Sequence, residues 1–229
     1  MKSTPTALVL LLLAVLPFAL AAKDERPNVI VFIADDVSWD DFGCYGNDDV
    51  QTPRIDALAA SGLRFTNAYL TASSCSPSRN SILLGRYPHN TGAAELHSHP
   101  PSTDVISFPE LLKDAGYHTV FSGKYHQGDY CLRAFDVISR EYEEITNSGQ
   151  GMWLQNLKDR PKDKPFFMWF ASLDAHRDWG KNPFSGTHDP ESIKVPLYLA
   201  DAEATRQDLA QYYDEVYRFD HTIGTIVDE

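Results

Sequence analysis

The sequence predicts an α/β fold with a mainly parallel sheet sandwiched between helices. Residues 28–34 (NVIVFIA) form a continuous apolar run rich in β-branched residues, which is typical of a parallel strand buried on both faces. Residues 117–122 and 165–172 (PFFMWFAS) have the same character and are predicted to be strands. Helical signals separate these runs, and this alternation favours a parallel sheet over an antiparallel one.

The first helices are predicted from the residues at their ends. Thr52 is a typical N-cap, Pro53 suits the first turn, and Gly62 closes the helix. A second helix is predicted over residues 77–84, so that it begins just after Cys75. The cysteine is therefore expected to lie directly before a helix N-terminus.

Two later helices have clear start signals. Ser107 and Glu110 have the spacing of a capping box, and Gly116 ends the helix that they begin. Thr205 with Asp208 predicts the start of a long helix that runs almost to the end of the sequence.

The remaining segments are assigned by composition. Residues 64–69 are predicted to form a further strand. Residues 140–165 and 177–204 are polar or rich in Pro and Gly, and are predicted to be loops. The sequence stops in a helical pattern that no strand follows, so we expect an interrupted domain.

Composition limits the classes of function. The chain has 229 residues, a formal net charge of -12 and 43% hydrophobic residues, enough for one sizeable globular domain. The acidic balance argues against binding to nucleic acid or to anionic membranes, which are recognised by basic patches. An anionic substrate would therefore need a local cluster of positive groups.

Residues 1–22 are predicted to be a secretory signal peptide. Lys2 gives a positive start, an apolar run extends from Ala7 to Leu16, and Ala19-Leu20-Ala21 has the pattern of a cleavage site. The alternative is an uncleaved anchor, but the run is shorter than the ~20 residues that a membrane span needs. We expect an exported protein without stable membrane insertion, periplasmic or extracellular, or lysosomal in a eukaryote.

The cysteines suggest one special thiol. An exported chain with an odd number of them, Cys44, Cys75 and Cys131, has one left over after any pairing. If Cys75 is the special one, Cys44 and Cys131 remain, and the sequence leaves open whether they pair.

Asp35 and Asp36 are candidate metal ligands. They directly follow the first predicted strand, and sites in open α/β sheets form outside the carboxyl ends of strands. Two adjacent carboxylates there suit a hard divalent cation. The alternative is that they form a turn or cap a helix.

Basic residues also fall at predicted strand and helix ends. Arg79 lies one turn beyond Cys75, Lys124 and His126 follow the strand at 117–122, and His176 follows the strand at 165–172. The helix start favours an anion, lysine binds anions as a point charge, and histidine carries protons near neutral pH. The alternatives are a reactive or buried cysteine and solvated surface residues.

Taken together, these segments resemble the sulfatase family over residues 26–229. The matching motifs are Pro27-Asn28 through Asp35-Asp36, Cys75-x-Pro77-x-Arg79, Gly123-Lys124-Tyr125-His126, His176, and the helix spacing of Tyr213, Tyr217, Asp220, Ile223 and Gly224. Within the family, the chain is most similar to sulfamidase-type (heparan N-sulfatase) members at residues 73–79, Leu96-His97, His176-Arg177, and Val195-Pro196 ahead of residues 206–212. The chain departs from the family pattern at Leu84, usually Thr, and at Ala175, usually Pro.

The resemblance implies an alkaline-phosphatase-like fold and hydrolysis of a sulfuric ester or sulfamate, on a sulfated sugar or another sulfate ester. It implies that a formylglycine-generating enzyme converts Cys75, and that Asp35, Asp36 and residue 75 bind Ca²⁺. It also implies that the catalytic residues are Cys75 itself, Arg79, Lys124, His126 and His176. The residues at 213–224 are expected to pack.

Two other functions stay open. One is a phosphonate or phosphodiester hydrolase of the same superfamily. The other is a truncated, non-catalytic fragment, because the family takes further metal ligands from a Ser-Asp-Asn/His-Gly segment that residues 23–229 lack. Residues 23–229 are therefore expected to be the N-terminal part of a sulfatase catalytic domain.

Overall fold

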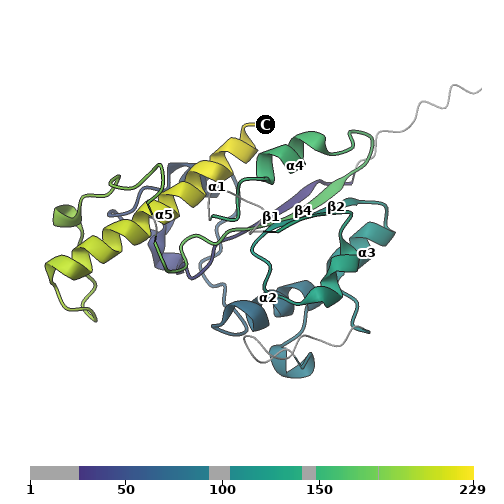
Figure 1. Cartoon of the computed structure of the whole chain (residues 1–229), viewed down its shortest axis with the longest axis horizontal. Helices are drawn as coiled ribbons and strands as arrows, with labels where there is room; N and C mark the ends of the chain where they lie inside the picture. Colours follow the sequence, from purple (N-terminus) through teal and green to yellow (C-terminus); the bar gives the residue numbers. More distant parts are fainter. Residues whose placement is uncertain (1–25, 93–103, 141–147, 180) are drawn as a thin grey trace, which may run out of the picture.

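The computed structural model describes residues 26–92, 104–140, 148–179 and 181–229. Its centre is a four-stranded parallel sheet with the order β1-β4-β2-β3, and helices lie on both faces (Figure 1). The predicted α/β fold with a mainly parallel sheet is confirmed. The predicted signal peptide, residues 1–22, lies outside the described residues.

The elements have the following bounds. The strands are β1 (Val29–Ile33), β2 (His118–Gly123), β3 (Val137–Arg140) and β4 (Phe166–Ala171). The α-helices are α1 (Pro53–Ser61), α2 (Cys75–Leu84), α3 (Phe108–Asp114), α4 (Trp153–Asp159) and α5 (Glu203–Val227). Short 3-10 helices cover Trp39–Asp41, Gly43–Tyr45, Pro88–Asn90, Asp129–Ala134 and Pro190–Ser192.

The central strand β4 explains why its sequence is apolar throughout. Its alternate residues enter opposite layers, because successive side chains of a strand point to opposite faces. Phe167 and Trp169 pack with α2 and α3, whereas Met168 and Phe170 pack with α4 and α5. Figure 1 shows these two helix pairs on opposite sides of the sheet. Both faces are therefore buried, as the continuous apolar run predicts.

Gly123, at the end of β2, lies where three backbone segments meet. Its φ is +102°, and a Cβ placed there would come within 1.9 Å of the Ala171 carbonyl oxygen and 2.5 Å of that of Gly149. A side chain cannot fit without separating β2 from β4. Only glycine allows this close approach.

The predicted capping box of α3 is confirmed, because Glu110 Oε1 accepts hydrogen bonds from the Ser107 backbone N–H (2.9 Å) and hydroxyl (3.0 Å). The helix ends at Asp114, and Gly116 follows with a φ of +88°.

The cap of α1 differs from the prediction. Thr52 occupies the N-cap position, but its hydroxyl oxygen accepts from the Gly43 N–H (2.8 Å) rather than from the helix. The carboxylate of Asp220, on α5, accepts instead from the N–H groups of Arg54 and Ile55. A distant residue therefore caps α1.

Some predicted boundaries were wrong. Helix α2 begins at Cys75 itself, and α5 begins at Glu203 with Ala202 as N-cap, upstream of the predicted cap at Thr205 and Asp208. Residues 64–69 form no strand, since none of the described strands pairs with them. Strand β3 went unpredicted, and α4 lies in a segment predicted to be a loop.

Cys44, Cys75 and Cys131 are all free thiols, so Cys44 and Cys131 do not pair. No helix in the described part of the chain has both the length and the apolar character to cross a bilayer.

Candidate active site

The candidate site lies at the carboxyl edge of the sheet. Asp35 follows β1 and Lys124 follows β2, while the segment after β4 leads to His176. Backbone hydrogen bonds fix these exits to one another: Asp35 N–H donates to the Asp174 carbonyl (2.7 Å), and Lys124 N–H donates to the Ala171 carbonyl (2.8 Å). Parallel strands thus bring distant residues to one edge, as expected for this fold class.

Asp35 is held between two cations. Its Oδ1 accepts from Arg79 Nη2 (3.0 Å), and its Oδ2 contacts Lys124 Nζ. All three residues are buried, with exposed fractions of 3% for Asp35, 3% for Arg79 and 6% for Lys124. Asp35 is therefore the buried carboxylate that pairs with both cations, while the Asp36 carboxylate, which lies within 4.8 Å of it, is half exposed. Asp35, Arg79, Lys124 and Cys75 are called the Cys75 cluster below.

Cys75 is the first residue of α2, not the residue before it. Its half-buried Sγ lies 3.8 Å from Lys124 Nζ. Burial raises the pKa of the Cys75 thiol, and the nearby Asp35 carboxylate adds to this, while Lys124 opposes it. The unmodified side chain is therefore held mainly as a thiol.

Asp36 and His176 form a second contact at the same edge. His176 Nε2 lies 3.7 Å from Asp36 Oδ2, and both side chains are about half exposed, at 44% and 54%. His176 Nδ1 lies 2.5 Å from the Arg177 carbonyl oxygen, so Nδ1 carries a proton and Nε2 faces Asp36. Asp36 has a φ of 55°, which is uncommon for a residue other than glycine, although aspartate adopts it more readily than most residues.

Asp35, Asp36 and Cys75 each place a ligand atom within 4.8 Å of the other two. The carboxylates are suitable donors for a hard cation such as Ca²⁺. At the position of the thiol, an oxygen group would be a better ligand for such a cation than sulfur. A positive charge already lies among these atoms, since Lys124 Nζ contacts both Asp35 and Cys75. Because the Lys124 charge opposes a further cation, the fit to a divalent cation rests on the two carboxylate donors.

His126 is less closely tied to the cluster. It lies two residues beyond Lys124, is half-buried, and its backbone N–H donates to Gln127 Oε1 (3.0 Å). Its side chain takes no part in the contacts of Arg79 and Lys124 with Asp35, of Lys124 with Cys75, or of His176 with Asp36.

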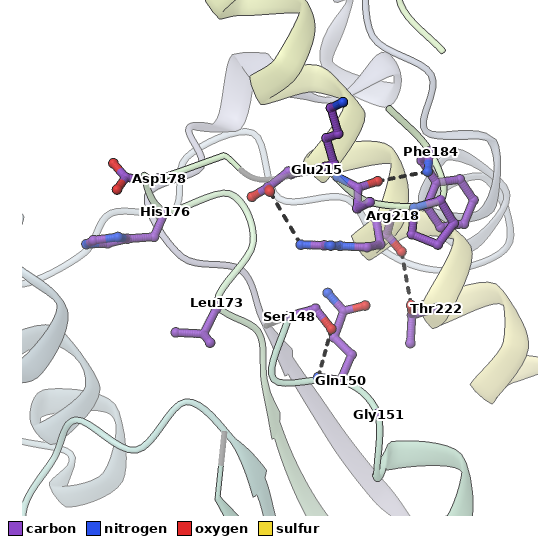
Figure 2. Close-up of a pocket in the computed structure, with 13 residues that line it drawn as sticks. Ser148, Gln150, Gly151, Leu173, His176, Asp178, Phe184, Glu215, Arg218 and Thr222 are labelled. Atoms are coloured by element: carbon purple, nitrogen blue, oxygen red, sulfur yellow. Dashed lines mark hydrogen bonds and ion pairs between the residues drawn. The ribbon is translucent and has the colours of Figure 1, made fainter. Parts of the chain in front are cut away.

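Sequence reasoning missed a second buried network beside the first. Arg218, on α5, pairs with both carboxylate oxygens of Asp174, and Gln150 Nε2 donates to Asp174 Oδ2 (2.6 Å). Glu215 Oε1 lies 3.5 Å from Arg218 Nη2 (Figure 2). Gln150, Asp174, Glu215 and Arg218 are called the Arg218 cluster below. The sequence contains one indication of this cluster, namely charged residues on the side of the long helix α5 that faces the core.

The remaining residues predicted on α5 pack as expected. Tyr213 and Ile223 are buried in the core, and Asp220 caps α1. Gly224 allows close approach of Arg54, because a Cβ there would come within 2.3 Å of Arg54 Nε.

The family is decided by a match over almost the whole described chain. The sequence model of the Sulfatase family matches residues 27–229. The chain belongs to the sulfatase family. This sulfatase is 32% identical to the N-sulphoglucosamine sulphohydrolase of Homo sapiens, over 89% of this chain and 47% of that relative. It therefore spans about half the length of that protein.

Solved structures support the fold of the sulfatase. A protein in complex with its substrate D-glucosamine-2-N,6-O-disulfate has a TM-score of 0.70 at 20% identity, over 89% of this chain and 62% of that one. The phosphonate monoester hydrolase of Agrobacterium radiobacter has a TM-score of 0.72 at 17% identity, over 89% and 59%. At these identities the structures establish a shared fold rather than a shared substrate.

Proposed function

We propose that this sulfatase removes sulfate from a sugar by attack from residue 75. The observation that carries the proposal is the position of Cys75, which begins α2 and lies 3.8 Å from Lys124 Nζ. The N–H groups and dipole of a helix start favour an anion. Arg79 Nη1 is buried without a hydrogen-bond partner among the described residues, so it is a further donor for sulfate oxygens.

The site is suited to the two groups that the family resemblance implies. Formylglycine, made from Cys75 by oxidation, would supply a hydrated aldehyde as the source of the attacking oxygen. Ca²⁺ held by Asp35, Asp36 and residue 75 would supply positive charge that stabilises the developing oxyanion. Because Ca²⁺ takes roughly 6–8 oxygen ligands, the sulfate, water or further protein groups must complete the set.

The protein's own residues supply orientation and proton transfer. Asp35 fixes Lys124 and Arg79 in place, so that both cations are preorganised for the sulfate. His176 Nε2 would donate a proton to the departing alcohol or amine, while the Arg177 carbonyl fixes the ring. His126 would accept the proton that accompanies sulfate release.

A sulfated amino sugar is the substrate class that we favour. The human relative is named for N-sulphoglucosamine, and the structural neighbour holds a disulfated glucosamine. The resemblance of His176-Arg177 to sulfamidase-type members agrees with this assignment. The protein would meet such a substrate outside the cytoplasm, after export directed by residues 1–22.

A second candidate function is phosphonate monoester hydrolysis. It stays open because the Agrobacterium radiobacter enzyme shares the fold, with a TM-score of 0.72 at 17% identity. Comparing turnover of an aryl sulfate with that of a phenyl phosphonate separates the two functions, because a true sulfatase should prefer the sulfate ester.

The proposal is tested first by mass spectrometry of the peptide that contains residue 75. In protein co-expressed with a formylglycine-generating enzyme, this peptide should show the mass of an aldehyde in place of a thiol. Cys44 and Cys131 provide internal controls, because both should keep their thiols. An active enzyme with an unmodified Cys75 would exclude the proposal.

Calorimetry tests the cation site independently of turnover. Asp36→Asn should weaken Ca²⁺ binding at least tenfold without changing the fold, since Asp36 is half exposed. Asp40→Asn, a change at a nearby exposed carboxylate outside the site, is the control and should bind Ca²⁺ normally. Equal affinities in the two variants would remove Asp36 from the metal site.

A further inference from the structure

The segment that leaves β4, residues 172–176, is joined to the segment that leaves β1 by two backbone hydrogen bonds. The Asp35 N–H donates to the Asp174 carbonyl (2.7 Å), and the Ala175 N–H donates to the Asp35 carbonyl (2.7 Å). His176 is the next residue along the chain. Its place in the site therefore depends on where Asp174 and Ala175 are held.

The Asp174 side chain anchors this segment to α5. Its Oδ2 accepts from Arg218 Nε (2.8 Å), and its Oδ1 accepts from Arg218 Nη2. Asp174 is fully buried, and Arg218 is 9% exposed. A two-pronged pair of this kind fixes direction as well as distance, because the donors of a guanidinium lie in one plane. In Figure 2 the Arg218 guanidinium extends from α5 toward the chain between Leu173 and His176.

Arg218 has no substitute as the cation that pairs with Asp174 in the described part of the chain. Gln150 Nε2 also donates to Asp174 Oδ2 (2.6 Å), but an amide carries no charge. Burial raises the pKa of Asp174, and Arg218 opposes this rise. Without Arg218, the buried carboxylate would have to take up a proton or move toward water. Either change disturbs the hydrogen bonds that hold the segment.

The same segment reaches the candidate active site at two points. Its backbone holds Asp35, whose carboxylate pairs with two cations, and at its end His176 Nε2 lies 3.7 Å from Asp36 Oδ2. Arg218 takes no part in these contacts. An effect of Arg218 on the site must therefore pass through Asp174.

We propose that Arg218 is a positioning residue for His176: by holding Asp174, it fixes the segment that places the His176 ring for proton transfer to the leaving group. The inference rests on the proposed function, because His176 has this role only in that reaction. Helix α5 thereby contributes to the active site, although none of the residues proposed to contact the sulfate lies on it.

Two substitutions separate the charge of Arg218 from its geometry. Arg218→Lys keeps the positive charge but supplies a point donor in place of the planar fork. Arg218→Gln removes the charge as well. Asp220→Ala is the matched control, because it removes the buried cap of α1 from the same helix and lowers stability without touching residues 172–176.

Hydrogen exchange of single amides tests the link without requiring turnover. In both Arg218 variants, the amides of Asp35 and Ala175 should exchange at least about tenfold faster relative to the amides of β2, because the segment opens locally. In Asp220→Ala, any increase should be the same for these amides and for those of β2, because the loss of stability is global.

The leaving group provides a readout that a purely structural role would not change. Phenyl sulfate has a poorer leaving group than para-nitrophenyl sulfate and depends more on a proton from His176. In the formylglycine-containing enzyme, Arg218→Lys should lower kcat for phenyl sulfate roughly tenfold to a hundredfold, with KM nearly unchanged. For para-nitrophenyl sulfate the loss should be less than about threefold. Asp220→Ala should affect both substrates equally.

The outcomes separate the positioning role from the proposed function. Selectively faster exchange of the Asp35 and Ala175 amides in the Arg218 variants, but not in Asp220→Ala, supports the proposal. Unchanged exchange in folded Arg218→Lys overturns it, and so do equal losses of kcat for the two substrates, while the sulfatase function stands. If the exchange is selectively faster but the unaltered, modified enzyme cleaves no sulfate ester, the link from Arg218 to the segment is supported and the proposed function is wrong.

Discussion

The two buried charge clusters at the carboxyl edge have opposite compositions. In the Cys75 cluster, one carboxylate, Asp35, is shared by two cations. In the Arg218 cluster, one cation is shared by the carboxylates of Asp174 and Glu215. Both are almost fully removed from water, so neither imbalance is screened by solvent.

This difference indicates what each cluster can receive. A surplus of buried positive charge is relieved by an anion, which agrees with sulfate beside residue 75. A surplus of buried acceptors is relieved by a proton.

The largest effect is expected from Asp35→Asn. Removing this charge leaves Arg79 and Lys124 buried without an anion, and the free energy of unfolding should fall by about 3–5 kcal/mol. Asp36→Asn is the matched control, because Asp36 is 54% exposed and the change should cost less than about 1 kcal/mol. Urea unfolding at pH 7 measures both. Similar losses of unfolding free energy in the two variants would mean that the buried charges of the Cys75 cluster are not unbalanced.

Asp174→Asn should cost less than Asp35→Asn, on the order of 1–3 kcal/mol. The reason is that Glu215, at 3.5 Å, can take over as the partner of Arg218. The double variant Asp174→Asn/Glu215→Gln removes this substitute and should lose more than the sum of the single changes. Additive losses, measured by the same urea unfolding, would show that the two carboxylates do not share the arginine.

Glu215→Gln should stabilise the protein at pH 8 and have little effect at pH 5. Burial, then the Asp174 carboxylate, raises the pKa of Glu215 from 4.5 to about 7, while Arg218 opposes the shift. The folded state therefore keeps a proton that the unfolded state loses, and this group makes stability fall as the pH rises from about 4.5 to 7. The gain at pH 8 should be on the order of 1–3 kcal/mol. Unfolding curves with the same pH dependence in both proteins would contradict this.

The smallest effect is expected at the exposed pair of Arg177 and Asp208. Its geometry is good, with two hydrogen bonds of 2.8 and 2.7 Å, but both side chains are largely in solvent. Asp208→Asn should leave the urea midpoint unchanged, because water compensates for the lost contact. A clear shift would show that ion-pair geometry matters more than burial in this molecule.

The residues of the Cys75 cluster come together in the structure from positions whose signals in the sequence are local. Asp35 directly follows an apolar strand, Lys124 directly follows another, and Arg79 lies one helical turn from Cys75. A parallel sheet then brings these positions together without further information. The strands β1, β2 and β4 were predicted for the same reason, since each is a buried run that can be recognised alone.

The Arg218 cluster could not be predicted in this way. Gln150, Asp174 and Arg218 come from a loop, a strand exit and a helix, and their pairing depends on how α5 packs across the sheet. The prediction of the α1 cap failed for a similar reason, because the capping residue, Asp220, lies 166 residues from Arg54 in the sequence. The strand predicted at 64–69 has apolar residues but no neighbouring strand among the described ones.

The backbone junction at Gly123 constrains how substrate preference can change. Gly123, Gly149 and Ala171 meet there, and the residues that follow them run to Lys124, Gln150 and Asp174. An insertion or a side chain at this point would shift Lys124 of the Cys75 cluster together with Gln150 and Asp174 of the Arg218 cluster. The junction therefore couples the two clusters, because a change of backbone here cannot move Lys124 and leave Gln150 and Asp174 in place.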